Sequence, residues 1–391
     1  MKTLGNEHVL SIGLVTTGLS NAGGMYRVSK EMVKQFVLRK DVKDVTVVVR
    51  ADLPSDPIEG AVLHPALGPV NYSLLTQWRV FIACMRYLRH CDFIHCLIEP
   101  YGPGAALAAL ILRKPFFISV IGTYSKPPKG SSPHDTIKRL LMRFMYRRAE
   151  MLLTMAEHNI RVINEVMTVN NWTFMPNGAD LAGFPMPASY APPAEPFILT
   201  VGALKPRKGQ DTTVKALALL KDRFPTLRYL IVGRADGFSS FVGRIKAVAE
   251  EGGVADRVVF TGRIDDEELI RLYQTCSAFV LAAREVDGSF EGFPTVFYEA
   301  HGCGAPVIST YGFSSEYAIK EGYNGFLVQP DDPAALADAI ANIVADGALR
   351  VQLGKNGRKE AELHSWDHIA AKHIEVYQRG VQKARGSLTQ N

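Results

Sequence analysis

Short apolar runs alternate with helical patterns along nearly the whole chain. This alternation is typical of parallel βα units. The sequence therefore predicts an α/β protein built from doubly wound parallel sheets. The expected strands lie around residues 9–15, 45–49, 93–97, 116–120, 151–154 and 172–175, and then around 197–201, 228–232, 258–261, 278–281, 306–309 and 325–328.

A proline-rich segment separates the two sets of expected strands. Residues 184–196 read FPMPASYAPPAEP and hold five prolines, which predicts a stiff, extended linker. The 391 residues are enough for two domains that each bury a sizeable core. We expect a first Rossmann-like domain over residues 1–185, a linker over 186–196, a second Rossmann-like domain over 197–365, and a final helix and tail over 366–391.

The composition excludes several classes of protein. Hydrophobic residues make up 47% and charged residues 21%, which is ordinary for a soluble globular protein. No apolar stretch approaches the roughly 20 residues needed to cross a bilayer, and the amino terminus does not resemble a secretory signal. We therefore expect a cytoplasmic protein. Nucleic acid is not an expected partner, because no aromatic-basic platform or helix-turn-helix pattern is present.

The five cysteines predict neither disulfides nor a zinc site. Their number is odd, and they show neither CxxC spacing nor histidine partners. We expect buried thiols in a reducing compartment, and no bound metal. These cysteines are Cys84, Cys91, Cys96, Cys276 and Cys303.

The segment EGFPTVFYE at residues 291–299 is the most informative motif. Pro294 suits the first position of a helix, so a helix is expected to start there. Its free amides and positive dipole end would then favour a phosphate above the Glu291 loop. Glu291 and Glu299 together suit a nucleotide sugar, whose hydroxyls donate to carboxylates. The alternative is a polar loop with ordinary surface acids.

An ordered series of motifs surrounds this acidic pair. It consists of VGALKPRKG at 201–209, YLIVG at 229–233, VVFTGRI at 258–264, GCGAPVIST at 302–310, SEYAI at 315–319 and NGFLVQPDD at 324–332. With this series the chain resembles the retaining glycosyltransferases of family 4, which have the GT-B fold. The resemblance implies two facing Rossmann-like domains, with the acceptor bound by the first domain and the nucleotide sugar by the second. It also implies that the final helix crosses back to the first domain.

The resemblance implies metal-independent, retaining transfer of a hexose from a nucleoside-diphosphate sugar, with UDP-glucose as the favoured donor. The acceptor would be a glycan or a lipid-linked molecule in polysaccharide or glycoconjugate assembly. No cofactor is expected besides the nucleotide-sugar cosubstrate. Two alternatives remain: a catalytically silent GT-B module that binds a nucleotide sugar or a partner glycosyltransferase, and a GT-B epimerase acting on UDP-sugars.

The expected catalytic residues are Lys208, Arg207 and Glu291. Lys208 follows a predicted strand, where it can stabilise the charge that accumulates on a departing diphosphate. In relatives an arginine after the strand's glycine also holds the diphosphate, but here that position is Ala203. We expect Arg207, or alternatively Lys205, to supply the missing charge. A solvated basic turn is the competing interpretation.

The resemblance assigns further donor-binding roles. Glu299 would bind the ribose and Glu291 the transferred sugar, while backbone amides near the loop glycines would bind phosphate or sugar. Each position has an ordinary structural alternative, such as a flexible turn for the paired glycines. The donor-binding residues are Gly23, Gly24, Arg263, Ile264, Gly292, Phe293, Pro294, Thr295 and Glu299.

The acceptor side departs from the family pattern. Many relatives have a sugar-contacting histidine where this chain has Ile121, so Thr123, Tyr124 or a main-chain group must take its place. His158 is a further candidate, although a loop histidine is more often structural or solvated. The segment Asn177-Gly178-x-Asp180 matches a family turn that we attribute to Asx geometry and a left-handed glycine.

Residues 136–150, TIKRLLMRFMYRRAE, place five basic residues among apolar ones. A helix of this composition can lie on anionic lipid, or it can be a packed helix with a solvated basic face. Together with the loop YSKPPKG at 124–130, it favours a lipid-linked or anionic glycan as acceptor and a peripheral contact with an anionic membrane.

Overall fold

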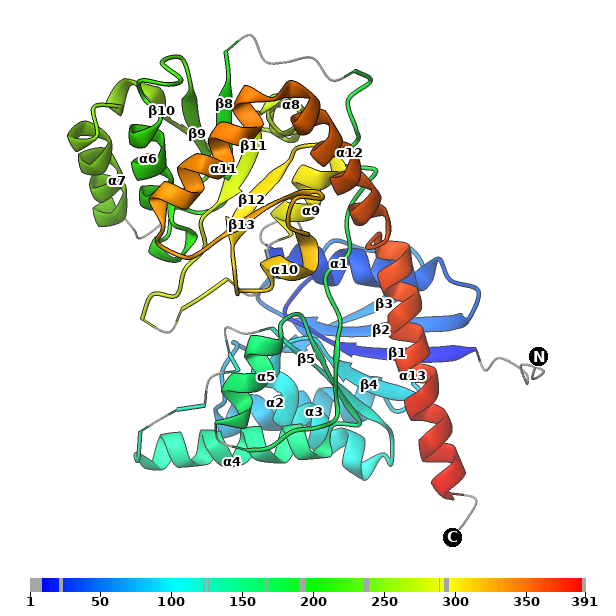
Figure 1. Ribbon diagram of the computed structural model, residues 1–391. Coiled ribbons are helices and arrows are strands. Elements are labelled where there is room, and N and C mark those ends of the chain that lie inside the picture. Colours follow the sequence, from blue (N-terminus) through cyan, green and yellow to red (C-terminus); the bar gives the residue numbers. More distant parts are fainter. Residues whose placement is uncertain are drawn as a thin grey trace. The chain divides into compact units, whose positions relative to one another are not determined.

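The computed structural model describes residues 9–20, 24–121, 124–125, 127–128, 130–165, 167–189, 195–234, 239–287, 289–291 and 295–388. These residues form two compact α/β units, each with one parallel sheet (Figure 1). The first unit comprises the chain up to Asn177 and the segment from Trp366 onward, and the second comprises Gly178–Ser365. The expected fold class, two doubly wound parallel sheets, is confirmed.

The first unit has a seven-stranded sheet with the order β3-β2-β1-β4-β5-β6-β7, and every neighbouring pair is parallel. The strands are β1 (Leu10–Val15), β2 (Val42–Arg50), β3 (Ala61–Leu67), β4 (Phe93–Cys96), β5 (Phe116–Val120), β6 (Met151–Thr154) and β7 (Trp172–Phe174). Their helices are α1 (Gly24–Val37), α2 (Leu74–Tyr87), α3 (Gly102–Ile111), α4 (Pro133–Arg148), α5 (Glu157–Asn164) and α13 (Trp366–Leu388), with a 3-10 turn at Glu99–Tyr101.

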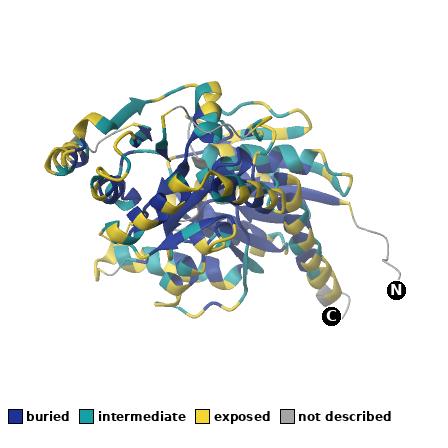
Figure 2. Cartoon of the chain, turned by 45° about the horizontal axis from the view of Figure 1, so that its top comes forward, coloured by how far each residue is buried: buried dark blue, intermediate teal, exposed yellow. Residues whose placement is uncertain are grey.

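Two helical layers cover the two faces of this sheet. Successive residues of a strand point to opposite faces, so Phe117 packs with Phe36 of α1 and Tyr377 of α13. Ile118, the next residue, belongs instead to the core that includes Met145 of α4 and residues of α2 and α3. The central strands are accordingly buried, whereas the outer faces of the helices are exposed (Figure 2).

The sequence analysis missed one strand, β3. This strand contains Pro65, and a proline within a strand pattern argues against a central strand because it cannot donate to a ladder. β3 lies at the edge of the sheet, where a proline is tolerated. The other expected strands of both units correspond to observed strands within a few residues at their ends.

The second unit has a six-stranded parallel sheet with the order β10-β9-β8-β11-β12-β13. Its strands are β8 (Phe197–Val201), β9 (Arg228–Val232), β10 (Val258–Gly262), β11 (Ala278–Leu281), β12 (Val307–Thr310) and β13 (Gly325–Val328). Its helices are α6 (Gln210–Leu219), α7 (Ser239–Glu251), α8 (Asp266–Thr275), α9 (Val296–Gly302), α10 (Ser315–Ala318), α11 (Pro333–Ala345) and α12 (Gly347–Glu362), with 3-10 turns at Pro206–Lys208 and Ala255–Arg257.

Each sheet reverses its winding direction at one point. In the first unit the chain moves outward from β1 to β3 and then returns to place β4 beside β1; in the second, β11 is likewise placed beside β8. Ligands of open α/β sheets bind at such switch points, outside the carboxyl ends of the strands. The loops after β8 and β11 are therefore the first place to look for a site in the second unit.

The division into units falls between Asn177 and Gly178, ahead of the expected linker at 186–196, whose residues 190–194 lie outside the described part. Helix α13 is grouped with the first unit. Within the described residues, no helix is both long enough and apolar enough to span a membrane.

Candidate functional site

Lys208 and Glu291 meet at the switch point of the second unit. Lys208 ends the 3-10 turn after β8, and Glu291 lies in the loop after β11; both side chains are buried. Lys208 Nζ donates to Glu291 Oε2 at 3.2 Å. Because β8 and β11 are neighbours in the sheet, the fold joins two motifs that are 83 positions apart in the sequence.

Arg207 approaches the other oxygen of the same carboxylate. Its Nε lies 2.7 Å from Glu291 Oε1, as an ion pair without hydrogen-bond geometry. The Arg207 side chain is 24% exposed, whereas that of Lys208 is 10% exposed. The expected catalytic residues Lys208, Arg207 and Glu291 are thus brought together in one cluster.

The electrostatics of this cluster favour an ionised Glu291. Burial acts to raise the pKa of its carboxyl, but the charges of Lys208 and Arg207, helped by Lys205, outweigh burial and hold the pKa below its ordinary value. Three cations therefore surround one carboxylate. The excess of positive charge suits an anionic ligand.

Two glycines make room for the cluster. Gly202 has φ 140°, and a Cβ at this position would lie 3.1 Å from Lys208 Nζ and Cε. Gly209 has φ 64°, and its Cβ would lie 1.9 Å from the carbonyl oxygen of Ala282. A side chain at Gly209 is incompatible with this close approach of the β8 and β11 loops.

A buried arginine that the sequence analysis missed fixes the loop after β11. Arg284 donates to both carboxylate oxygens of Asp211, at 2.8 and 2.9 Å, and to Asp331 Oδ1 at 2.8 Å. Its backbone N–H donates to the Arg207 carbonyl at 2.9 Å. Arg284 thus ties the loop that carries Glu291 to α6 and to the turn after β13. The available signal was an arginine three residues after the end of a buried strand.

Glu299 lies on α9, where its Oε2 accepts a hydrogen bond of 3.0 Å from the hydroxyl of Tyr273 on α8. The side chain is half-buried. Helix α9 begins at Val296, with Thr295 as its N-cap, rather than at the expected Pro294. Such a difference of one or two residues is within the usual uncertainty of helix ends.

Arg263 and Ile264 follow β10, at the edge of the sheet, two strands from β8. Arg263 is exposed and Ile264 is partly buried. Among the described residues, neither is joined by a hydrogen bond or ion pair to the Lys208–Glu291 cluster. Gly24 begins α1 in the first unit. Five of the expected site residues lie outside the described residues, namely Gly23, Thr123, Gly292, Phe293 and Pro294.

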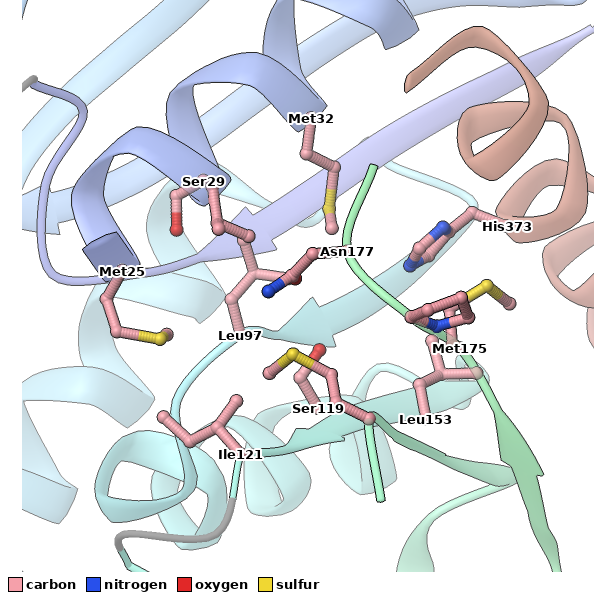
Figure 3. A pocket seen from close by; sticks show the side chains of 13 residues that line it. Met25, Ser29, Met32, Leu97, Ser119, Ile121, Leu153, Met175, Asn177 and His373 are labelled. Carbon is pink, nitrogen blue, oxygen red and sulfur yellow. The ribbon is translucent and has the colours of Figure 1, made fainter. Parts of the chain in front are cut away.

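In the first unit, Ile121 lines a small pocket at the carboxyl ends of the strands (Figure 3). The walls include the side chains of Met25, Met32 and Met175, and Asn177 reaches in among them (Figure 3). Ile121 itself cannot make the polar contact that the family histidine would make. Polar side chains nevertheless line part of the pocket, namely Ser29, Ser119, Asn177 and His373.

The predicted geometry of the turn at Asn177 and Gly178, with an Asx hydrogen bond and a left-handed glycine, differs from the observed one. Gly178 is not among the glycines with positive φ, and Asn177 is buried and lines the pocket. An Asx-type hydrogen bond is found instead at Asp180, whose Oδ1 accepts from the N–H of Gly183 at 2.9 Å. The side chain of Asn177 therefore lines the pocket, and it is Asp180 that accepts the hydrogen bond of the turn.

Glu99 is a buried carboxyl near the carboxyl end of β4 that the sequence analysis also missed. It accepts a hydrogen bond from the hydroxyl of Ser125, next to the expected acceptor residue Tyr124. Burial raises the pKa of Glu99 to about 7, although the hydrogen bond from Ser125 acts to lower it. Burial also raises the pKa of Tyr124. His158 lies partly buried at the start of α5 and does not line the pocket.

We expect Glu99→Gln to remove a pH dependence of stability. In the unfolded chain this carboxyl ionises near 4.5, but in the folded protein only near 7. Its contribution to the free energy of unfolding therefore falls as the pH rises from 4.5 to about 7. From about pH 5 to about pH 8, the stability of the variant relative to the wild type should rise by roughly 2.5 kcal/mol.

Urea unfolding at several pH values measures this difference. Glu375→Gln, at an exposed glutamate of the same unit, is the control. A constant difference between Glu99→Gln and the wild type across this range would show that Glu99 does not titrate as described.

Cys91 has a histidine neighbour, contrary to the sequence analysis. Its Sγ lies 3.6 Å from Nε2 of His90, and Asp44 Oδ1 lies 3.7 Å from the same nitrogen. Within the described residues, these three are the group whose donor atoms are close enough to share a metal ion. They lie at the amino ends of β2 and β4, the edge opposite the pocket. Burial raises the pKa of the Cys91 thiol to about 12. All five cysteines are free and buried, as expected.

The model of the family described as "Glycosyl transferases group 1" matches residues 156–360, just over half of the chain. A D-inositol 3-phosphate glycosyltransferase of Acidothermus cellulolyticus is 31% identical over 198 residues, which cover 49% of this chain and 43% of that protein. A protein of the same description from Corynebacterium jeikeium is 27% identical over 92% of this chain and 93% of its own length. Several of the curated relatives, among them the protein of Acidothermus cellulolyticus, are matched over less than half of their own length.

Among solved structures, HepE of Anabaena in complex with UDP and glucose has a TM-score of 0.70 at 19% identity. The similarity covers 94% of this chain and 98% of that protein. This likeness concerns the fold of the two units.

Proposed function

The chain belongs to the glycosyl transferases of group 1, and on this premise we propose that it transfers a hexose from a nucleoside-diphosphate sugar to a glycan or lipid-linked acceptor. The proposed reaction is retaining and needs no metal ion. It serves polysaccharide or glycoconjugate assembly.

The observation that carries this proposal is the cluster of Lys208, Arg207 and Glu291 at the switch point of the second unit. Breaking the anomeric C–O bond leaves negative charge on the departing diphosphate. Lys208 and Arg207 offer positive charge at the carboxyl ends of β8 and β11, where open α/β sheets bind ligands. Fixed donors of this kind stabilise developing charge without reorganisation during the reaction.

Glu291 has two roles in this proposal. It holds Lys208 and Arg207 through its two oxygens, and so orients both cations before the ligand arrives. Its carboxylate also accepts hydrogen bonds from hydroxyls of the transferred sugar, each worth about 1.5–3 kcal/mol. In the retaining reaction the acceptor oxygen bonds to the anomeric carbon on the face that the diphosphate leaves, and a diphosphate oxygen receives the acceptor's proton.

The donor nucleotide is proposed to be UDP. The bound UDP of the structurally similar HepE supports this choice. The excess of cations around Glu291 suits the diphosphate of either nucleotide. Glu299, fixed by Tyr273, is the proposed partner of the ribose hydroxyls.

The acceptor is proposed to be anionic or lipid-linked, and the enzyme to meet it in peripheral contact with an anionic membrane. The names of the relatives support an anionic acceptor, because they act on inositol 3-phosphate. Helix α4 supports the membrane contact, because its exposed face carries Arg143 and Arg147.

Calorimetry with UDP and GDP tests the proposed donor. We expect UDP to bind the wild type, and a UDP concentration of 100 times its dissociation constant to raise the free energy of unfolding by about 2.7 kcal/mol. Lys208→Ala should weaken this binding, whereas Lys215→Ala, at an exposed lysine of α6, should not. GDP binding with no response to UDP would reverse the choice of nucleotide. Binding of neither nucleotide would exclude the proposal.

A further inference from the structure

Helices α2, α3 and α4 of the first unit expose large apolar side chains on their outer faces. They form one layer, with α2 packed on α3 and α3 on α4. We call their outer surface the α2–α3–α4 face. Its exposed apolar residues are Leu74, Leu75, Trp78, Ile82, Leu107, Leu110, Ile111, Ile137 and Leu140.

Helix α2 shows most clearly that this surface is unusual. Leu74, Trp78 and Ile82 follow one another at intervals of four residues and are 64%, 59% and 44% exposed. The opposite side of the same helix buries Val80 and Cys84 in the core. A helix with one core-facing side normally has polar residues on its other side. The outer side of α2 is instead apolar, as if it faced a second apolar medium.

A groove runs between the three helices. It has a volume of about 440 Å³ and is lined by apolar side chains that include Trp78, Phe81, Leu107, Leu141 and Phe144. The rings of Trp78 and Phe81 stack with their centroids 5.3 Å apart. The groove could accept a hydrocarbon chain without leaving a polar group unsatisfied.

The charged residues of these helices are almost all basic. Arg79 and Arg86 of α2 and Arg143 and Arg147 of α4 are exposed. All residues of the three helices are described, and Asp135, in the first turn of α4, is their only acidic residue. An exposed apolar surface with arginines and almost no acids fits a partner that is apolar inside and negatively charged at its surface.

We propose that the α2–α3–α4 face docks on an anionic lipid bilayer. Trp78 and the exposed leucines enter the boundary between headgroups and acyl chains, and the arginines meet the anionic headgroups. A symmetric dimer through this face would instead bring the like charges of two copies together. The sequence indicated only α4, whereas the structure adds the larger apolar contribution of α2 and α3. This inference extends the membrane contact of the proposed function, and its biological purpose rests on that function. The test of membrane docking needs no nucleotide.

Flotation of the full chain with vesicles tests the docking. We expect binding to vesicles of phosphatidylcholine with phosphatidylserine, and much weaker binding to phosphatidylcholine alone. The double variant Leu75→Ser and Trp78→Ser should lower the partition coefficient more than tenfold, because two large apolar groups no longer enter the membrane. The double variant Arg143→Glu and Arg147→Glu should lower it more than tenfold on anionic vesicles, at roughly fivefold per lost cation.

Matched controls lie in the second unit. Leu219→Ser replaces a leucine that is 61% exposed, and Arg223→Glu reverses an exposed arginine. Neither should change flotation by more than about twofold, since neither lies on the face. An unchanged unfolding midpoint shows that the face variants are folded.

Tryptophan fluorescence gives a second measurement. Of the three tryptophans, Trp78 is exposed, Trp172 is partly buried and Trp366 is buried. Anionic vesicles should therefore shift the emission to shorter wavelength in the wild type but not in Trp78→Phe. The proposal is overturned if the wild type does not float, if face and control variants float equally, or if sedimentation shows a dimer that the Leu75→Ser and Trp78→Ser variant dissociates.

Discussion

Replacing Lys208 by alanine is expected to lower kcat/KM for the donor by about 10²–10³-fold, because the reaction loses a fixed positive charge beside the departing diphosphate. The Lys208 side chain is buried and hydrogen-bonded to Glu291, so a solvent-exposed lysine could supply this charge only by moving into the site. Steady-state hydrolysis of UDP-glucose, or transfer from it, measures the loss. Most of the loss should appear in kcat if the charge acts in the transition state rather than in ground-state binding.

Lys215→Ala is the matched control, because it removes a lysine from the exposed side of the neighbouring helix α6. It should leave kcat/KM within about twofold of the wild type. If the wild type binds UDP but turns over no faster than Lys208→Ala, the chain is a silent nucleotide-sugar-binding module. That result would refute glycosyl transfer while leaving the binding site in place.

Replacing Arg284 by alanine is expected to destabilise the second unit by about 3–5 kcal/mol, the usual cost of removing one partner of a buried ion pair. Burial acts to lower the pKa of this guanidinium, but hydrogen bonds to Asp211 and Asp331 raise it, so the charge is well stabilised in place. The variant leaves Asp211, 1% exposed, without its bidentate partner. Denaturant unfolding measures the change.

Arg244→Ala is a control at the same carboxylate. Arg244 Nε lies 3.1 Å from Asp211 Oδ2, but its side chain is 59% exposed. Exposed ion pairs usually contribute less than about 1 kcal/mol, so this variant should be only slightly destabilised. Equal effects of the two variants would contradict the view that Arg284 holds the loop of Glu291 in place.

The sequence was sufficient to locate nearly all strands, because their apolar runs are continuous and bounded by turn residues. The exception, β3, shows the limit of this reasoning. Pro65 weakens a strand pattern locally, and only its place at the sheet edge makes the strand possible. Helix α2 shows a different limit, since apolar residues on all sides predict burial but do not say which side is left exposed.

In the candidate site, the sequence motifs pointed to Lys208, Arg207 and Glu291, and these residues do lie together. Their partners could not be predicted. Glu291 was expected to bind the transferred sugar, but in the structure it forms ion pairs with both cations. Arg284 and Glu99 belong to none of the sequence motifs. Such pairings depend on which strand ends are neighbours, and that is a property of the whole sheet.

The sequence by itself determined the alternation of strands and helices, the position of nearly every strand, the division into two α/β units and the identity of the cationic and acidic motifs. These follow from local periodicity and turn chemistry, which act over a few residues. Only the tertiary structure decided that β11 lies beside β8, which joins Lys208 to a carboxylate 83 positions away. It also decided that three helices of the first unit share one apolar outer face, because packing on a sheet selects which side of each helix stays outside.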